Sequence, residues 1–106
     1  MEKILIIEDD TNINNMIAEV LTREGYQCLQ AFAGTEGLLY VRSEKPALVI
    51  LDLMLPGMMG EELLPVIKDE CEIPVIVLSA KDDLDSKIEL LTTGADDYMT
   101  KPFSPS

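Results

Sequence analysis

The most informative part of this sequence is the stretch from 49 to 56, Val49-Ile50-Leu51-Asp52-Leu53-Met54-Leu55-Pro56. The apolar run that ends at Leu51 predicts a strand buried on both faces. Pro56 and Gly57 stop any continuation and predict a loop. Asp52 therefore stands at the carboxyl end of a buried strand, where open α/β sheets usually bind ligands. This stretch alone leaves open whether Asp52 caps a turn or belongs to a functional site.

The rest of the chain predicts strands and helices in strict alternation. Apolar runs rich in β-branched residues predict the strands, and apolar residues spaced three and four apart predict the helices. The expected strands cover 3–7, 26–32, 47–52, 75–78 and 97–100, and the expected helices run from 11 to a stop at Gly25, and over 34–45, 60–70 and 82–93. Because the connections are too long for hairpins, this alternation predicts a parallel sheet wrapped on both faces.

Several residues mark the ends and faces of these helices. Asp10 or Thr11 is the expected N-cap of the first helix, and Gly25 its C-terminal stop. Pro65 is expected within the first turns of the third helix, where proline is tolerated. The apolar residues that mark the first two helices are Ile13, Met16, Ile17, Val20, Leu21, Leu38, Leu39 and Val41.

Composition excludes several classes of function. The chain has 106 residues, the size of one domain, and its formal net charge of -12 argues against nucleic acid or an anionic membrane as a direct partner of this segment. It has neither an apolar run long enough to span a membrane nor a signal-peptide pattern. Cys28 and Cys71 lack metal or redox spacing and are expected to be reduced, which predicts a cytoplasmic location. The absence of histidine excludes imidazole chemistry.

Polar residues recur at the carboxyl ends of the predicted strands. They are Glu8 and Asp9 after the first strand, Asp52 after the third, Ser79 after the fourth and Lys101 after the fifth. In a right-handed, doubly wound parallel sheet these ends lie along one edge, so the side chains are expected to converge.

The chemistry of these groups is complementary. Carboxylates that lie close together repel one another, so at neutral pH they need protons or a cation. Oxygen ligands without histidine or cysteine suit Mg²⁺. An aspartate beside such an ion can accept a phosphoryl group and form an aspartyl phosphate. Lys101 would then neutralise phosphoryl charge, and Ser79 would donate a hydrogen bond to a phosphoryl oxygen.

With these residues in view, the whole chain resembles a receiver domain of a bacterial two-component response regulator. The resemblance rests on Ile-Ile-Glu-Asp-Asp at 6–10, Leu-Asp-Leu-Met-Leu-Pro-Gly at 51–57, Leu-Ser-Ala at 78–80 and Lys-Pro-Phe at 101–103. It implies a flavodoxin-like, three-layer α/β/α fold with a five-stranded parallel sheet of order 2-1-3-4-5. The implied site residues are the phosphoacceptor Asp52, the lysine Lys101, the switch residues Ser79 and Tyr98, and a metal site of Glu8 (through water), Asp9, Asp52 and the backbone carbonyl of Met54.

The resemblance also implies a function, a cofactor and partners. A sensor histidine kinase or a phosphotransfer protein would phosphorylate Asp52 in the presence of Mg²⁺, for which Mn²⁺ or Ca²⁺ could substitute. The domain would then act as a switch for an attached effector rather than as a conventional enzyme. Gly94-Ala95-Asp96-Asp97-Tyr98 is similar to the OmpR/PhoB type, which implies a DNA-binding effector and a homodimer through the fourth helix, fifth strand and fifth helix. One departure from the family pattern is Met59, where many relatives carry aspartate.

The end of the sequence gives a further expectation. Ser104-Pro105-Ser106 reads as the opening of a fifth helix, so residues 1–106 are expected to form one receiver domain without that helix or an effector domain. An apolar strip beside the first helix would then be uncovered, which predicts self-association or marginal stability and a compromised dimer face.

Three other classes of function fit this sequence less well. A flavodoxin-like mononucleotide binder needs a Ser-, Thr- or Gly-rich loop after the first strand, and Glu8-Asp9-Asp10 there would repel phosphate. An aspartate-based phosphohydrolase normally places its nucleophile after the first strand and carries a cap domain. A receiver-like docking module that is never phosphorylated would not need the full set of site residues.

Overall fold

The computed structural model describes residues 2–52, 60–70, 72–79 and 97–100. In chain order the elements are β1 (Lys3–Ile7), α1 (Thr11–Arg23), β2 (Gln27–Ala31), α2 (Gly34–Glu44), β3 (Leu48–Asp52), α3 (Gly60–Glu70), β4 (Val75–Ser79) and β5 (Asp97–Thr100). Each predicted strand agrees with its observed strand to within one residue at either end. The helix predicted over 82–93 lies outside the described residues.

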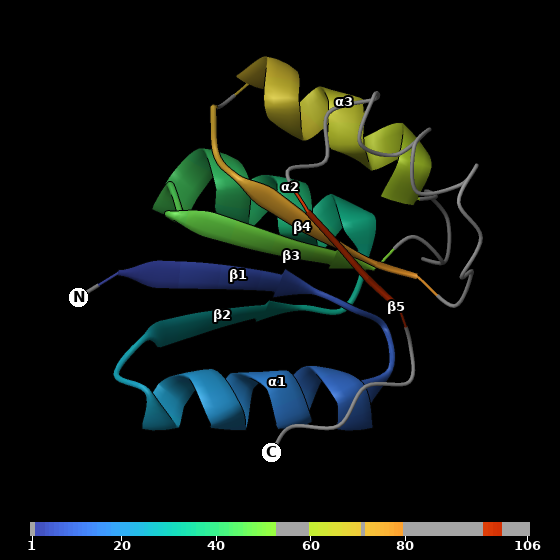
Figure 1. Cartoon of the computed structure of the whole chain (residues 1–106). Helices are drawn as coiled ribbons and strands as arrows, with labels where there is room; N and C mark the ends of the chain where they lie inside the picture. Colours follow the sequence, from blue (N-terminus) through green and yellow to red (C-terminus); the bar gives the residue numbers. More distant parts are fainter. Residues whose placement is uncertain (1, 53–59, 71, 80–96, 101–106) are drawn as a thin grey trace.

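The five strands form one parallel sheet in the order β2-β1-β3-β4-β5, which confirms the predicted topology. Figure 1 shows α1 on one side of this sheet and α2 and α3 on the other. Strand β1 lies between β2 and β3, with Ile7 paired to both Ala31 and Leu51. The carboxyl ends of the inner strands β1 and β3 are therefore neighbours.

Two hydrophobic clusters, one on each face of the sheet, form the core. Alternate residues of a strand point to opposite faces, so Leu5 and Ile7 pack toward α2 and α3 while Ile4 and Ile6 pack toward α1. The α2/α3 side also contains Ala31, Val41, Val49, Leu51, Leu63, Leu64, Ile67, Val75 and Val77, and the α1 side contains Ile17, Ile50 and Leu78. Burial on both faces explains why the inner strands are continuously apolar.

Both ends of α1 confirm the residues expected to define them. The Asp10 carboxylate accepts a hydrogen bond from the Ile13 N–H at 3.1 Å and caps the first turn. At the other end Gly25 has a φ of 95°, a conformation that favours glycine. The Gly25 N–H donates to the Thr22 carbonyl at 3.0 Å, and the Tyr26 N–H donates to the Leu21 carbonyl at 3.1 Å. This pair of bonds is a Schellman motif.

Helix α2 packs on the sheet differently from the expectation. Leu39 is 65% exposed, whereas Gly34, Gly37 and Val41 are buried. A Cβ at Gly37 would overlap the side chain of Ile7, so this glycine permits close approach of α2 to β1. The buried face therefore consists largely of small residues, which a search for large apolar side chains does not find.

Pro65 lies in α3 where the predicted bounds placed it, because the helix covers Gly60–Glu70 as expected. It is the sixth residue of the helix that begins at Gly60, beyond the first turn. A proline there removes the N–H that would bond to the carbonyl four residues earlier. Leu63, Leu64 and Ile67 are nevertheless fully buried, so packing on the sheet compensates for the lost bond.

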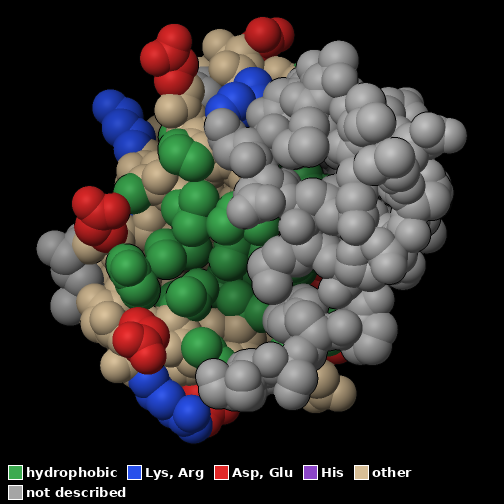
Figure 2. Space-filling view, viewed as in Figure 1, with side chains coloured by type: hydrophobic (Ala, Val, Ile, Leu, Met, Phe, Trp, Pro, Cys, Tyr) green, Lys and Arg blue, Asp and Glu red, His purple; other side chains and the backbone are tan. Residues whose placement is uncertain are grey.

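Some hydrophobic side chains of the described residues remain at least partly exposed at the surface. Figure 2 shows hydrophobic side chains gathered at the surface near the middle of the view, with charged side chains toward the left of the view. On the α1 face, Leu48 is half-buried and packs beside Ile50. No helix among the described residues has the length and apolar character needed to cross a bilayer.

Candidate functional site

The register of the sheet places two of the predicted site residues at the same level. Ile7 of β1 pairs with Leu51 of β3. Glu8 and Asp52 each come one residue later, so they lie side by side at the carboxyl edge of the sheet. The Glu8 N–H donates to the Ala31 carbonyl at 3.0 Å, which extends the pairing of β1 with β2 by one residue. Glu8 is thus held as part of the sheet rather than as part of a free loop.

Three carboxylates converge at this edge. Glu8, Asp9 and Asp52 each offer an oxygen that lies within 4.8 Å of those of the other two. The side chain of Asp9 is exposed, whereas Glu8 is 0% and Asp52 2% exposed. Carboxylates crowded in a buried position are costly unless protons, hydrogen bonds or a cation compensate for their charge.

The donor set fits a divalent cation. Oxygens that coordinate Mg²⁺ at about 2.0–2.1 Å in an octahedron lie about 3–4 Å apart, a spacing that these three groups reach with small movements. All three donors are carboxylates, the hard ligands that Mg²⁺, Mn²⁺ and Ca²⁺ prefer. Among the described residues, the cluster at the carboxyl edge is therefore a candidate site for a divalent metal.

The remaining predicted site residues are placed only in part. Ser79 ends β4, one residue after Leu78, which pairs with Asp52, and Ser79 itself pairs with Thr100 of β5. Tyr98 pairs with Val77 in the same sheet. The backbone thus brings Ser79 to the edge where the carboxylates lie. Lys101 and Met54 lie outside the described residues.

One buried residue near the carboxylates was missed by the sequence reasoning. Asn14 of α1 is 0% exposed, and its side-chain amide donates to the Glu8 carbonyl at 3.0 Å and to the Ala31 carbonyl at 3.1 Å. A signal was present in the sequence, because Asn14 shares helical spacing with Ile17 and Leu21 on the apolar face. A polar residue on that stripe, so soon after a strand end, indicates a specific hydrogen-bonding role.

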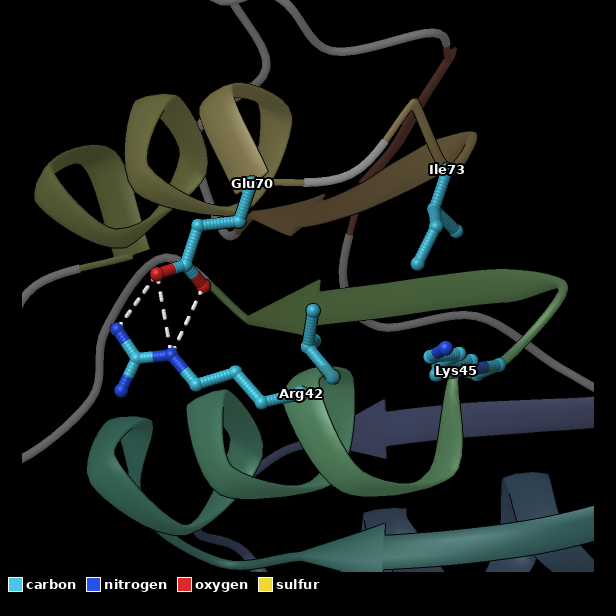
Figure 3. Close-up of a pocket in the computed structure, with 6 residues that line it drawn as sticks. Arg42, Lys45, Glu70 and Ile73 are labelled. Atoms are coloured by element: carbon cyan, nitrogen blue, oxygen red, sulfur yellow. Dashed lines mark hydrogen bonds and ion pairs between the residues drawn. The ribbon is translucent and has the colours of Figure 1, made fainter.

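A pocket at the opposite edge of the sheet has a different character. It is lined by Val41, Arg42, Lys45, Pro46, Glu70 and Ile73, where α2 and α3 end and β3 and β4 begin. Figure 3 shows Arg42 and Glu70 facing each other across the gap between the two helices, with three bonds of 2.6–3.0 Å. Opposite charges here satisfy each other, so this pocket does not gather reactive groups as the carboxyl edge does.

Comparison with known proteins agrees with this geometry. The model of the response regulator receiver domain family matches residues 4–106. The chain is 48% identical over 105 residues to the phosphate regulon transcriptional regulatory protein PhoB of Pseudomonas aeruginosa, covering 96% of this chain and 46% of that protein. It is 40% identical over 104 residues to the DNA-binding response regulator MtrA of Mycobacterium tuberculosis, covering 98% and 46%.

Solved structures support the same assignment. The receiver domain of the Francisella response regulator 1452 superposes with a TM-score of 0.93 at 37% identity, over 98% of this chain and 87% of that chain. A two-component response regulator from Clostridium difficile superposes with a TM-score of 0.94 at 26% identity, over 98% and 86%.

The chain belongs to the response regulator receiver domain family. It is a phosphoacceptor domain of two-component signalling and not a conventional enzyme, and its acidic cluster fits that role. The chain spans about half the length of the curated relatives it matches, and two of those relatives are transcriptional or DNA-binding regulators.

Proposed function

We propose that Asp52 is the residue that accepts the phosphoryl group. The observation that carries this proposal is the convergence of Glu8, Asp9 and Asp52 at the carboxyl edge of a receiver fold. Asp52 ends the inner strand β3 and lies between the edges of β1 and β4, so a group bound there is reached from both sides. In the reaction, an Asp52 carboxylate oxygen attacks the phosphorus atom while the bond from phosphorus to the donor breaks, which leaves an acyl phosphate.

The residues around Asp52 take complementary roles in this proposal. The residues that would hold Mg²⁺, for which Mn²⁺ or Ca²⁺ could substitute, are Asp9, Asp52 and the backbone carbonyl of Met54, with Glu8 acting through water. When bound, the ion neutralises charge on the phosphoryl oxygens and on the crowded carboxylates. Lys101 would supply positive charge, and Ser79 would donate a hydrogen bond to the phosphoryl group. Tyr98 changes rotamer when Ser79 moves and carries the signal onward.

Partners follow from the same reading. The donor is a sensor histidine kinase or a phosphotransfer protein, and residues 1–106 act as one receiver domain within a longer regulator. Because PhoB and MtrA are named as transcriptional or DNA-binding regulators, the attached effector is proposed to bind DNA. The protein is also proposed to form a homodimer through the fourth helix, the fifth strand and the fifth helix, a face of which the structure describes only the strand β5.

Incubation with acetyl phosphate and Mg²⁺, followed by intact mass measurement, tests the central claim. We expect wild type to gain the mass of one phosphoryl group and Asp52→Asn to gain none, because the amide is not a nucleophile toward phosphorus. Asp69→Asn is the matched control, since Asp69 is an exposed aspartate on α3, and it should be phosphorylated as wild type is. An equal mass gain in Asp52→Asn would overturn the assignment.

A further inference from the structure

Asn14 is a buried polar residue whose side chain forms hydrogen bonds with Glu8, just after β1, and with residues at the end of β2. Its Nδ2 group donates to the carbonyls of Glu8 and Ala31, at 3.0 and 3.1 Å. Both partners are pure acceptors, so the side chain must present its NH₂ group to them. Its Oδ1 accepts from Gln30 Nε2 at 2.9 Å, and Gln30 Nε2 also donates to Asn15 Oδ1 at 2.8 Å. The amide of Asn14 is thus fixed on both sides.

These bonds fix the residue that carries the first carboxylate. Glu8 donates its N–H to the Ala31 carbonyl at 3.0 Å and gives its own carbonyl to Asn14. Its main chain is therefore held on both sides, by β2 through Ala31 and by α1 through Asn14. Because the chain leaves the sheet at this point, the bond to Asn14 sets the direction in which Glu8 and Asp9 present their carboxylates.

A purely structural role for Asn14 explains less of this arrangement. The first turn of α1 is already capped by Asp10, which accepts from the Ile13 N–H. Ile17 and Leu21 share the face of Asn14, so an apolar side chain there would extend the hydrophobic contact of α1 with the sheet. An asparagine gives up that apolar contact and has a lower helix propensity than leucine. What it adds is a defined path for the Glu8–Asp9 turn.

We propose that Asn14 is a positioning residue of the divalent-metal site. It lies one layer behind the carboxylates and acts through the Glu8 main chain. Partners of this kind, which orient the groups that bind a metal, commonly affect metal affinity by about 10–100-fold when they are removed. This proposal rests on the proposed function, because it assumes that Glu8 and Asp9 hold a cation.

Titration calorimetry with Mg²⁺ on Asn14→Leu tests the proposal. Leucine has a similar shape but no N–H donors, so we expect the affinity for Mg²⁺ to fall by at least about tenfold. The free energy of unfolding, measured with urea in EDTA, should change much less than the free energy of Mg²⁺ binding. The reason is that new apolar contact with Ile17 and better helix propensity offset the lost hydrogen bonds. Asn14→Ser keeps one donor and should bind Mg²⁺ with intermediate affinity.

Gln30→Met is the matched control. It removes the bond to Asn14 Oδ1 but leaves both bonds from Asn14 Nδ2, so its Mg²⁺ affinity should stay within about twofold of wild type. Wild-type affinity in Asn14→Leu would overturn the positioning role while leaving the metal site intact. If Asn14→Leu does not fold, wild-type affinity in Asn14→Ser overturns it equally. A wild-type protein that binds no Mg²⁺ would overturn the metal site itself, and the positioning role with it.

Discussion

The two edges of the sheet differ in how their charged side chains are arranged. At the amino edge, Arg42 and Glu70 lie at the ends of α2 and α3 and form an ion pair between largely exposed side chains. At the carboxyl edge, Glu8 and Asp52 are buried together with the carboxylate of Asp9 close by. Opposite charges are paired near the surface at the amino edge, whereas like charges lie close together at the carboxyl edge, where two of the three carboxylates are buried.

This contrast separates a structural edge from a functional one. Ion pairs near the surface contribute little to stability. Lys3 and Glu44 form another such pair, half-buried, with their charged groups 3.4 Å apart. Buried like charges cost stability and persist only where another requirement outweighs that cost. The crowded carboxylates at the carboxyl edge fit a site for a divalent cation, which would offset the cost of burying them there.

The largest effect that would test the contrast is stabilisation by Mg²⁺. At a free concentration ten times its Kd, a ligand of the native state stabilises it by about 1.4 kcal/mol. For a domain of this size that raises the Tm by roughly 5–10 °C, and thermal unfolding followed by circular dichroism measures it. We expect Asp9→Asn to lose more than half of the increase, because one of the three carboxylates is gone. Sodium chloride at matched ionic strength is the control, and an equal increase with it would contradict a specific site.

A smaller effect on stability is expected when one carboxylate at each edge is replaced by the corresponding amide. Without divalent ions, Asp52→Asn should stabilise the protein by about 1 kcal/mol in urea unfolding, because it removes one of the two buried charges in a cluster of three carboxylates. Glu70→Gln should have the opposite sign and a small magnitude, because it breaks the pair with Arg42. Destabilisation by both substitutions would show that the carboxyl edge is not under electrostatic strain.

The smallest effect concerns pH at the amino edge. The hydrogen bond from Arg42 holds the pKa of Glu70 below its ordinary value of 4.5, and the same bond raises the pKa of Arg42. A carboxyl group with a lowered pKa stabilises the fold fully above its unfolded pKa and loses that contribution as pH falls through the lowered value. The stability difference between wild type and Glu70→Gln should therefore be constant above about pH 5 and shrink toward pH 3. A difference that grows on acidification would reject the pair as its source.

Much of the fold could be predicted from local sequence. The alternation of apolar runs and helical spacing predicted the strands and helices, and Asp10 and Gly25 predicted both ends of α1. The parallel topology then implied that Glu8 and Asp52 would lie together, because both follow inner strands. These features depend on short-range periodicity and on the handedness of connections, which a sequence carries directly.

Other features depended on the close fit of distant segments. Leu39 faces solvent although it is strongly apolar, because Gly37 brings the opposite face of α2 against Ile7. Pro65 was expected within α3, but only the structure shows that burial of Leu63 and Leu64 beside it compensates for the hydrogen bond that proline removes. Helix propensity and hydrophobic pattern depend only on the local sequence, so they do not predict compensation by contacts with other segments.

The sequence by itself determined the alternating, parallel α/β fold class and brought Glu8, Asp9 and Asp52 to one edge, and its resemblance to the receiver family implied the order of the strands. Only the tertiary structure decided that Arg42 meets Glu70 and that Asn14 joins Glu8 to Ala31. The physical reason is range. Periodicity and chain direction act over a few residues, whereas these hydrogen bonds join groups that become neighbours only after the helices have packed on the sheet.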